Sequence, residues 1–141
     1  MISPANMAAL HALAFARSPA RPWSEAEFRD LLGTTGTYAV GHAEAFAVAR
    51  VIADEAELLT IATHPSRRRM GLARSMMTVW QREAIARGAT RAFLEVAADN
   101  LAALRLYHAC GYTEVGRRKN YYQRPGATSA DALTMSRDLS N

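Results

Sequence analysis

The sequence predicts an α+β fold, in which helices lie on both faces of a mostly antiparallel sheet. Residues 37–63 contain short apolar runs separated by turn residues, a pattern typical of an antiparallel meander. Residues 55–118 then alternate between strand and helix patterns. A strand–helix–strand unit joins parallel strands through a right-handed crossover, so we expect one parallel pair within the sheet.

One domain is expected over residues 1–141, because this length is too short for two ordinary domains and half of the residues are hydrophobic. The longest apolar runs fall far short of the ~20 residues of a membrane helix. Cys110 is the single cysteine and there is no signal-peptide pattern, so we expect a cytoplasmic protein. His11 and His42 are interpreted as surface or turn residues, and no metal site is expected. The net charge of +4 fits a phosphate-bearing cofactor as well as nucleic acid.

Two helices are expected before the sheet. Apolar residues at helical spacing predict the first over residues 4–17, and the proline-containing segment 18–22 then breaks it. Ser24 stands three residues before Glu27, the spacing of a capping box. A second helix should therefore begin there and end at Gly33.

The remaining elements follow from changes of period along the chain. The predicted strands cover residues 37–40, 43–52, 55–63, 91–96, 112–118 and 130–138. A turn at Gly41–His42 should separate the first two strands. The broad apolar face of residues 72–87 predicts a long helix, and a further helix, capped by Asp99 or Asn100, should run to Ala109.

A basic turn, Arg67-Arg68-Arg69-Met70-Gly71-Leu72-Ala73-Arg74, lies between the third strand and the long helix. The free N–H groups of a first helical turn attract anions, and the helix dipole adds to this attraction. Gly71 would let a phosphate approach the backbone without a Cβ in the way. A solvated basic turn is the alternative interpretation of the arginine cluster taken alone.

This turn and the residues after it resemble the GNAT superfamily of N-acetyltransferases. Arg68 to Ala73 match its acyl-CoA signature, Arg/Gln-x-x-Gly-x-Gly/Ala, with Ala73 in place of the second glycine. The residues that resemble the downstream block are Phe93-Leu94-Glu95-Val96, Asn100, Leu106-Tyr107 and Gly111-Tyr112. Residues 116–122 and Pro22-Trp23-Ser24 are similar to the RimI group, the ribosomal-protein alanine N-acetyltransferases. The resemblance covers about residues 20–138.

The resemblance implies the GNAT fold, whose parallel strand pair splays at the acetyl-CoA site. Acetyl-CoA would be the cosubstrate, with pantetheine pairing as an added strand and one main-chain amide polarising the thioester carbonyl. The basic turn would hold the pyrophosphate. Asn100 would cap its helix, contact the cofactor, or do both. The implied cofactor-binding residues are Ile61, Ala62, Thr63, Arg68, Arg69, Met70, Gly71, Leu72, Ala73, Arg74 and Asn100.

Glu95 and Tyr107 are the catalytic candidates. A carboxylate in an otherwise apolar strand needs partners or a wet cleft, although an edge glutamate that points to solvent is the alternative. The resemblance implies that Glu95 is the general base and that Tyr107, otherwise a core residue, is the general acid for the coenzyme A thiolate. Glu57 is the competing base, but it lies at the start of its strand.

The resemblance implies a protein N-terminus as acceptor, namely the N-terminal alanine of a ribosomal protein. An α-amine is roughly 14% neutral at pH 7 whereas a lysine is only about 0.04% neutral, so a modest base suffices for direct attack. Trp23, Tyr121 and Tyr122 are predicted to line the acceptor site. The alternatives are a GNAT acting on a small amine or an aminoacyl-tRNA, and a non-catalytic coenzyme A-binding module. A nucleic-acid partner is disfavoured, because residues 117–122 form only one compact basic and aromatic cluster.

The N-terminus is expected to depart from the GNAT pattern. Most members open with a strand before the first helix, whereas three residues precede that helix here. We therefore expect that the first edge strand is missing or that the start is truncated, with consequences for the acceptor side and not for the catalytic centre.

Overall fold

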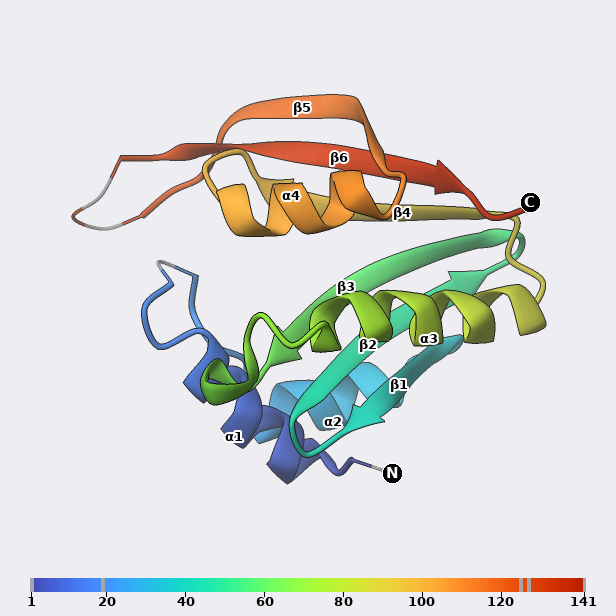
Figure 1. The fold of residues 1–141 in the computed structure, drawn as a ribbon, viewed down its shortest axis with the longest axis horizontal. Coiled ribbons are helices and arrows are strands. Elements are labelled where there is room, and N and C mark those ends of the chain that lie inside the picture. The colour runs from blue at the N-terminus through green and yellow to red at the C-terminus, as the bar shows by residue number, and fades with distance from the viewer. Residues whose placement is uncertain (1, 19, 125, 127, 141) are drawn as a thin grey trace.

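The computed structural model describes residues 2–18, 20–124, 126 and 128–140, so Pro19 of the predicted helix break lies outside it. The helices are α1 (Pro4–Ala14), α2 (Glu25–Leu32), α3 (Leu72–Ala86) and α4 (Leu101–Ala109), with a short 3-10 helix at Pro65–Arg67. The strands are β1 (Thr37–His42), β2 (Ala45–Ile52), β3 (Glu55–Thr63), β4 (Arg91–Ala97), β5 (Thr113–Tyr122) and β6 (Ala130–Asp138). They form one sheet in the order β1-β2-β3-β4-β6-β5 (Figure 1).

The predicted fold class is confirmed. β1, β2 and β3 form the antiparallel meander, and β3 and β4 are the parallel pair. β1 and β5 are the two edge strands of the sheet, and no strand precedes α1 among residues 2–18. No helix in the described part of the chain is long and apolar enough to cross a membrane.

Helix ends follow local signals. The capping box of α2 is confirmed, because Ser24 Oγ accepts a hydrogen bond from the Glu27 N–H at 3.2 Å and the Glu27 carboxylate accepts one from the Ser24 N–H at 3.0 Å. α1 ends at Ala14, earlier than predicted. Phe15 leaves the helical conformation there, and its ring stacks on His11 at 4.1 Å between centroids.

The predicted turn at Gly41–His42 is wrong. β1 continues through His42, and the chain reverses at Ala43 and Glu44. Gly41 has a φ of +124°, and a Cβ at this position would lie 2.3 Å from the Ala45 carbonyl oxygen. Glycine is therefore needed for the close approach of β2 and not for the reversal. At the other end of the sheet, β5 extends beyond its predicted end at residue 118 and reaches residue 122.

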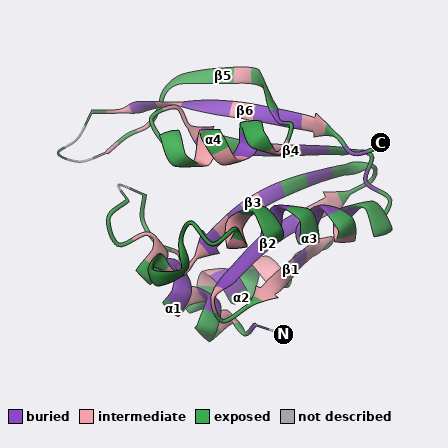
Figure 2. Cartoon of the chain, in the orientation of Figure 1, coloured by how far each residue is buried: buried purple, intermediate pink, exposed green. Residues whose placement is uncertain are grey.

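The sheet separates two apolar cores. On one face, α3 contributes Met77 and Trp80 and α4 contributes Tyr107. On the other face, α1 and α2 cover β2 with Met7 and Phe28 among their buried residues. Figure 2 shows the long buried stretches on β2 and β6. A groove on the sheet face opposite α3 is lined by residues of β3 and β4, among others.

β3 and β4 pair over only part of their lengths. Their register joins Glu55–Leu58 to Arg91–Leu94, and the described pairings end there. The pairing of β3 with β2 is irregular just after this point. Ala49 pairs with Leu58 but Val48 pairs with Thr60, so Leu59 is an extra residue with no partner on β2. Figure 1 shows the two strands close together at one end and diverging at the other.

This bulge also changes which residues of β3 face which core. Ala56 and Leu58 pack in the cluster beneath α3, whereas Ala62 packs in the cluster beneath α1 and Thr60 contacts α1. An extra residue shifts the two-residue alternation of a strand by one. The bulge therefore accompanies both the divergence of β3 from β4 and the switch of its side chains between faces.

Candidate active site

The diverging part of β3 carries Ile61, Ala62 and Thr63. These residues pair with β2 on one side, and they have no partner on the β4 side in the pairings of the described strands. The N–H and C=O groups of an unpaired strand edge can accept an added extended segment. The geometry therefore suits the extended pantetheine arm that these residues were expected to hold.

The basic turn leads into α3 with the first-turn N–H groups available. Gly71 is the N-cap residue with a φ of +78°, and a Cβ built on it meets nothing within 4 Å. The helical ladder starts with the Ser75 N–H, which donates to the Gly71 carbonyl oxygen at 2.9 Å. The N–H groups of Leu72, Ala73 and Arg74 precede this ladder and face the N-terminal end of the helix. This end of α3 can hold an anion such as a pyrophosphate.

The arginine side chains of the turn have unequal surroundings. Arg67 forms an ion pair with Glu44 in the β1–β2 turn. Arg68 donates to the Ala14 carbonyl oxygen at 2.7 Å, which ties the turn to the end of α1. Arg69 is exposed and makes no hydrogen bond or ion pair with the described residues. Two arginines of the cluster therefore hold the turn in place, and Arg69 is available to a ligand.

Asn100 and Arg74 contact opposite ends of α4. Asn100 is the N-cap of this helix, and its Oδ1 accepts a hydrogen bond from the Ala103 N–H at 3.2 Å. Arg74 reaches the Ala109 carbonyl oxygen at the other end of α4, at 3.5 Å. Met70 is 62% exposed beside the turn, with its side chain outside both cores. Asn100 thus has a structural role whether or not it touches the cofactor.

Glu95 is exposed on β4, just beyond the last residue that pairs with β3. Its Oε1 accepts a hydrogen bond from Tyr122 Oη at 3.3 Å. Glu95 and Glu57 line the same groove, of about 480 Å³, on the sheet face opposite α3. Glu57 forms an ion pair with Arg50 at 3.0 Å, whereas Glu95 has no cationic partner among the described residues. Glu95 is therefore the more available of the two carboxylates.

Tyr107 is only 7% exposed on α4, and its ring lies edge-on to Tyr112 at 6.2 Å between centroids. Burial, with smaller contributions from Cys110 and Tyr122, raises the pKa of Tyr107 to about 12, so its hydroxyl is protonated at neutral pH. In the described residues, every fully buried side-chain N or O atom has a hydrogen-bond partner. The Oη of Tyr107 has no partner among these residues, so it is not fully buried. The hydroxyl therefore reaches accessible space and can donate a proton there.

Comparison with known proteins decides the family. Residues 5–112 match the family model described as the Acetyltransferase (GNAT) family. The chain belongs to the GNAT acetyltransferase family. The [Ribosomal protein bS18]-alanine N-acetyltransferase of Escherichia coli K12 is 36% identical to it over 128 residues, covering 88% of this chain and 86% of the relative. N-alpha-acetyltransferase RimI of Mycobacterium tuberculosis is 36% identical over 128 residues, covering 83% and 76%.

A solved structure gives the same result. The crystal structure of the ribosomal-protein-S18-alanine N-acetyltransferase from Escherichia coli matches this GNAT chain with a TM-score of 0.82 and 33% identity, over 100% of this chain and 92% of that one. The predicted family, fold and acetyltransferase activity are thus confirmed, with acetyl-CoA as cosubstrate. Among the residues that the structure describes, no cluster of three or more His, Cys, Asp or Glu side chains could hold a metal ion.

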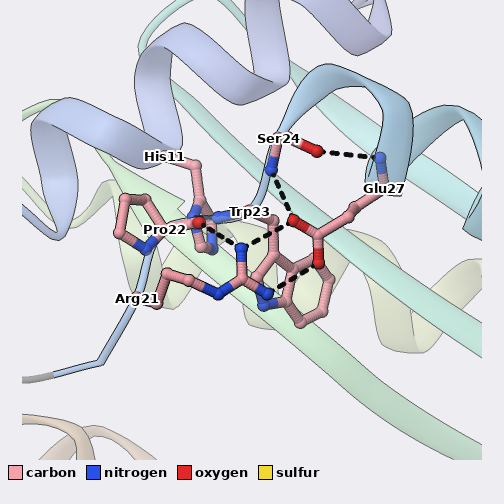
Figure 3. A network of polar contacts seen from close by, with 6 residues as sticks. All are labelled: His11, Arg21, Pro22, Trp23, Ser24 and Glu27. Atoms are coloured by element: carbon pink, nitrogen blue, oxygen red, sulfur yellow. Dashed lines mark hydrogen bonds and ion pairs between the residues drawn. The ribbon is translucent and has the colours of Figure 1, made fainter.

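The aromatic residues expected on the acceptor side of this GNAT enzyme lie in two places. Trp23 is half-buried, and its ring stacks on His11 at 5.4 Å between centroids (Figure 3). Tyr121 is 48% exposed and the Arg118 guanidinium lies 4.9 Å from its ring centroid. Tyr122 is half-buried and, unlike Tyr121, contacts the candidate base.

The prediction that His11 is a surface residue is wrong. It is 1% exposed on α1, where its Nδ1 accepts a hydrogen bond from the Trp23 N–H and its Nε2 lies 3.0 Å from Thr60 Oγ1. Because Nδ1 is the acceptor, the ring proton lies on Nε2 and is donated to Thr60. Burial lowers the pKa of His11 to about 4, against an opposing contribution from Glu27. Its place four residues after buried Met7, on the apolar face of the helix, was the available sequence signal.

Proposed function

We propose that this GNAT enzyme acetylates the N-terminal α-amine of a protein, and that the acceptor is a ribosomal protein with an N-terminal alanine. The 36% identity with the Escherichia coli [Ribosomal protein bS18]-alanine N-acetyltransferase, over 88% of this chain, carries the proposal. The open groove at Glu95 supports it, since an extended chain end can enter there. Such an acceptor implies a cytoplasmic enzyme.

The geometry of β3 and α3 supports the proposed cofactor-binding role. The free edge of Ile61, Ala62 and Thr63 would pair with the pantetheine arm, and a main-chain N–H there would polarise the thioester carbonyl. The first-turn N–H groups after Gly71 would bind the pyrophosphate, helped by the charge of Arg69. Bound acetyl-CoA supplies the acetyl group as an activated thioester.

The environments of Glu95 and Tyr107 support the proposed acid–base roles. Glu95, which has no cationic partner in the described chain, would accept a proton from the acceptor amine as its nitrogen bonds to the acetyl carbon. Tyr107, protonated at neutral pH, would donate its proton to the coenzyme A sulfur as the carbon–sulfur bond breaks. The two transfers leave an amide and a free thiol, with no covalent enzyme intermediate.

The acceptor side would be formed by Trp23 and the two tyrosines at the end of β5. Trp23 lies in the segment between α1 and α2, which the bidentate Arg21–Glu27 pair, at 2.7 and 2.8 Å, holds in place (Figure 3). This segment and the end of β5 would then flank the amine.

The decisive experiment incubates the purified protein with acetyl-CoA and several acceptors. These are a peptide that begins with alanine, the same peptide with a blocked N-terminus and an internal lysine, a polyamine and an aminoacyl-tRNA. We expect acetylation of the free alanine peptide, and a loss of about 100-fold or more in kcat for Glu95→Gln and for Tyr107→Phe.

Glu57→Gln is the matched comparison, since it makes the same change on the same groove. It should retain most of the kcat, because Glu57 is already paired with Arg50. Preferred turnover of the blocked lysine peptide, the polyamine or the tRNA would refute the acceptor. Undiminished turnover by Glu95→Gln would refute its role as base.

A further inference from the structure

Tyr122 occupies an unusual position for a residue expected to line an acceptor channel. Its Oη donates a hydrogen bond to Glu95 Oε1 at 3.3 Å. Tyr122 also makes a minor contribution to raising the pKa of Tyr107, the candidate acid. Burial first, and then the charge and hydrogen bond of Glu95, raise the pKa of Tyr122 to about 12. Its hydroxyl therefore stays protonated at neutral pH and can donate a hydrogen bond.

An irregularity in β5 brings Tyr122 to this place. Arg118 pairs with Ala132 on β6, and the next recorded pair is Tyr122 with Ala130, so β5 has two more residues than β6 between these pairs. Asn120 adopts a φ of +50° within the extra length, and its N–H donates to Asp131 Oδ1 at 2.9 Å. Bulges of this kind redirect the side chains that follow them.

An ion pair then holds the end of the hairpin against α4. Arg124 donates to both carboxylate oxygens of Asp99, at 2.6 and 3.2 Å, and its side chain is only 11% exposed. Its guanidinium lies 5.9 Å from the ring centroid of Tyr122. Asp99 directly precedes Asn100, the N-cap of the helix that carries Tyr107. The pair therefore links the hairpin that presents Tyr122 to the helix that presents the candidate acid.

We infer that Tyr122 is a positioning residue for Glu95, and that the Arg124–Asp99 pair keeps Tyr122 in place. This rests on the proposed role of Glu95 as general base. A carboxylate accepts about four hydrogen bonds, so one from Tyr122 restrains its orientation and leaves lone pairs for the proton of the acceptor. The restraint acts on the rate of proton transfer more than on acceptor binding.

A double-mutant cycle separates this role from a peptide-binding role. The kcat and KM for the alanine peptide are measured for Tyr122→Phe, Glu95→Gln and the double variant. We expect Tyr122→Phe to lower kcat by about tenfold with little change in KM, and to cause no further loss in the Glu95→Gln background. Asp99→Asn should reproduce part of the loss, and it should have no added effect in the Tyr122→Phe background.

Glu83→Gln serves as the control for the loss of an ion pair. Glu83 pairs with Arg87 at 3.2 Å on the exposed side of α3, and its removal should leave kcat unchanged. Urea unfolding of every variant shows whether a loss of activity reflects misfolding. As a readout independent of turnover, NMR titration of labelled tyrosine should find a lower pKa for Tyr122 in Glu95→Gln than in the native enzyme, because burial alone then remains as the main cause of the shift.

The outcomes test the positioning role of Tyr122 and the base role of Glu95 separately. An equal loss from Tyr122→Phe in both backgrounds, or a change confined to KM, overturns the positioning role and leaves the base role intact. An unchanged pKa of Tyr122 in Glu95→Gln overturns the contact itself. Full activity of Glu95→Gln overturns the base role and the positioning role together.

Discussion

Two glycines at opposite ends of α3 share a backbone conformation, and only one of them lies at the proposed pyrophosphate site. Gly71 before the helix has a φ of +78° and Gly88 after it has a φ of +96°. A Cβ built on either residue meets nothing within 4 Å. Alanine at either position therefore has the same backbone cost and no steric clash within the protein.

This symmetry allows a controlled test of the proposed pyrophosphate site. Gly71→Ala and Gly88→Ala should each lower the free energy of unfolding by about 1–2 kcal/mol, measured by urea titration, because alanine disfavours positive φ. Calorimetry should find weaker acetyl-CoA binding for Gly71→Ala alone, since its Cβ would occupy the path of the phosphate. Equal affinities of the two variants would contradict the site.

At the scale of elements, His11 joins three segments of the fold. From α1 it contacts Thr60 on β3 and the Trp23 main chain in the α1–α2 connection, and its ring lies between those of Phe15 and Trp23. Thr60 directly follows the bulge at which β3 leaves β4. The docking of α1 is thus coupled to the strand that carries the predicted pantetheine edge.

The protonation of His11 should make this docking sensitive to pH. Its pKa is about 4 in the folded protein against 6.5 for the ordinary side chain, so the unfolded chain takes up the proton first as the pH falls. The contribution to stability is complete above about pH 6.5 and is lost towards pH 4. Between pH 7 and pH 4.5 we expect a loss of about 2–3 kcal/mol from this residue.

Urea unfolding at the two pH values measures this loss. His11→Gln should be less stable at pH 7 but should show a smaller dependence on pH, by about the amount above. His108→Gln, which changes an exposed histidine on α4, serves as the control for the loss of a histidine. Identical pH dependence in His11→Gln and the native protein would refute the assignment.

At the scale of the whole molecule, the sheet consists of two parts. One part contains β1, β2 and β3, the other contains β4, β6 and β5, and a short ladder between β3 and β4 joins them. β3 and β4 are in register over four residue pairs, from Glu55 with Arg91 to Leu58 with Leu94. Beyond them the parts diverge, although α3 and α4 still share one apolar core. A cofactor arm added to the free edge of β3 would extend the pairing across this divergence.

Hydrogen–deuterium exchange should detect this extension. Saturating acetyl-CoA should slow exchange at residues 59–63, whose backbone groups would gain partners, while residues 55–58, already paired with β4, should change little. Coenzyme A lacking the acetyl group should give much the same protection, because the pantetheine arm is common to both. Protection confined to the start of α3 would contradict the added-strand geometry.

The order of the elements, the parallel crossover and the basic turn before α3 follow from the sequence alone, because periodicity, helix caps and glycines act between neighbouring residues. Glu95 could be selected as a catalytic candidate for a similar reason, because it is a charged residue in an otherwise apolar strand. The bulge at Leu59, the burial of His11 and the contact of Tyr122 with Glu95 required the tertiary structure. His11 and Thr60 are 49 positions apart, and Tyr122 and Glu95 are 27 apart. Such contacts depend on how separate strands and helices pack, and no local pattern encodes that packing.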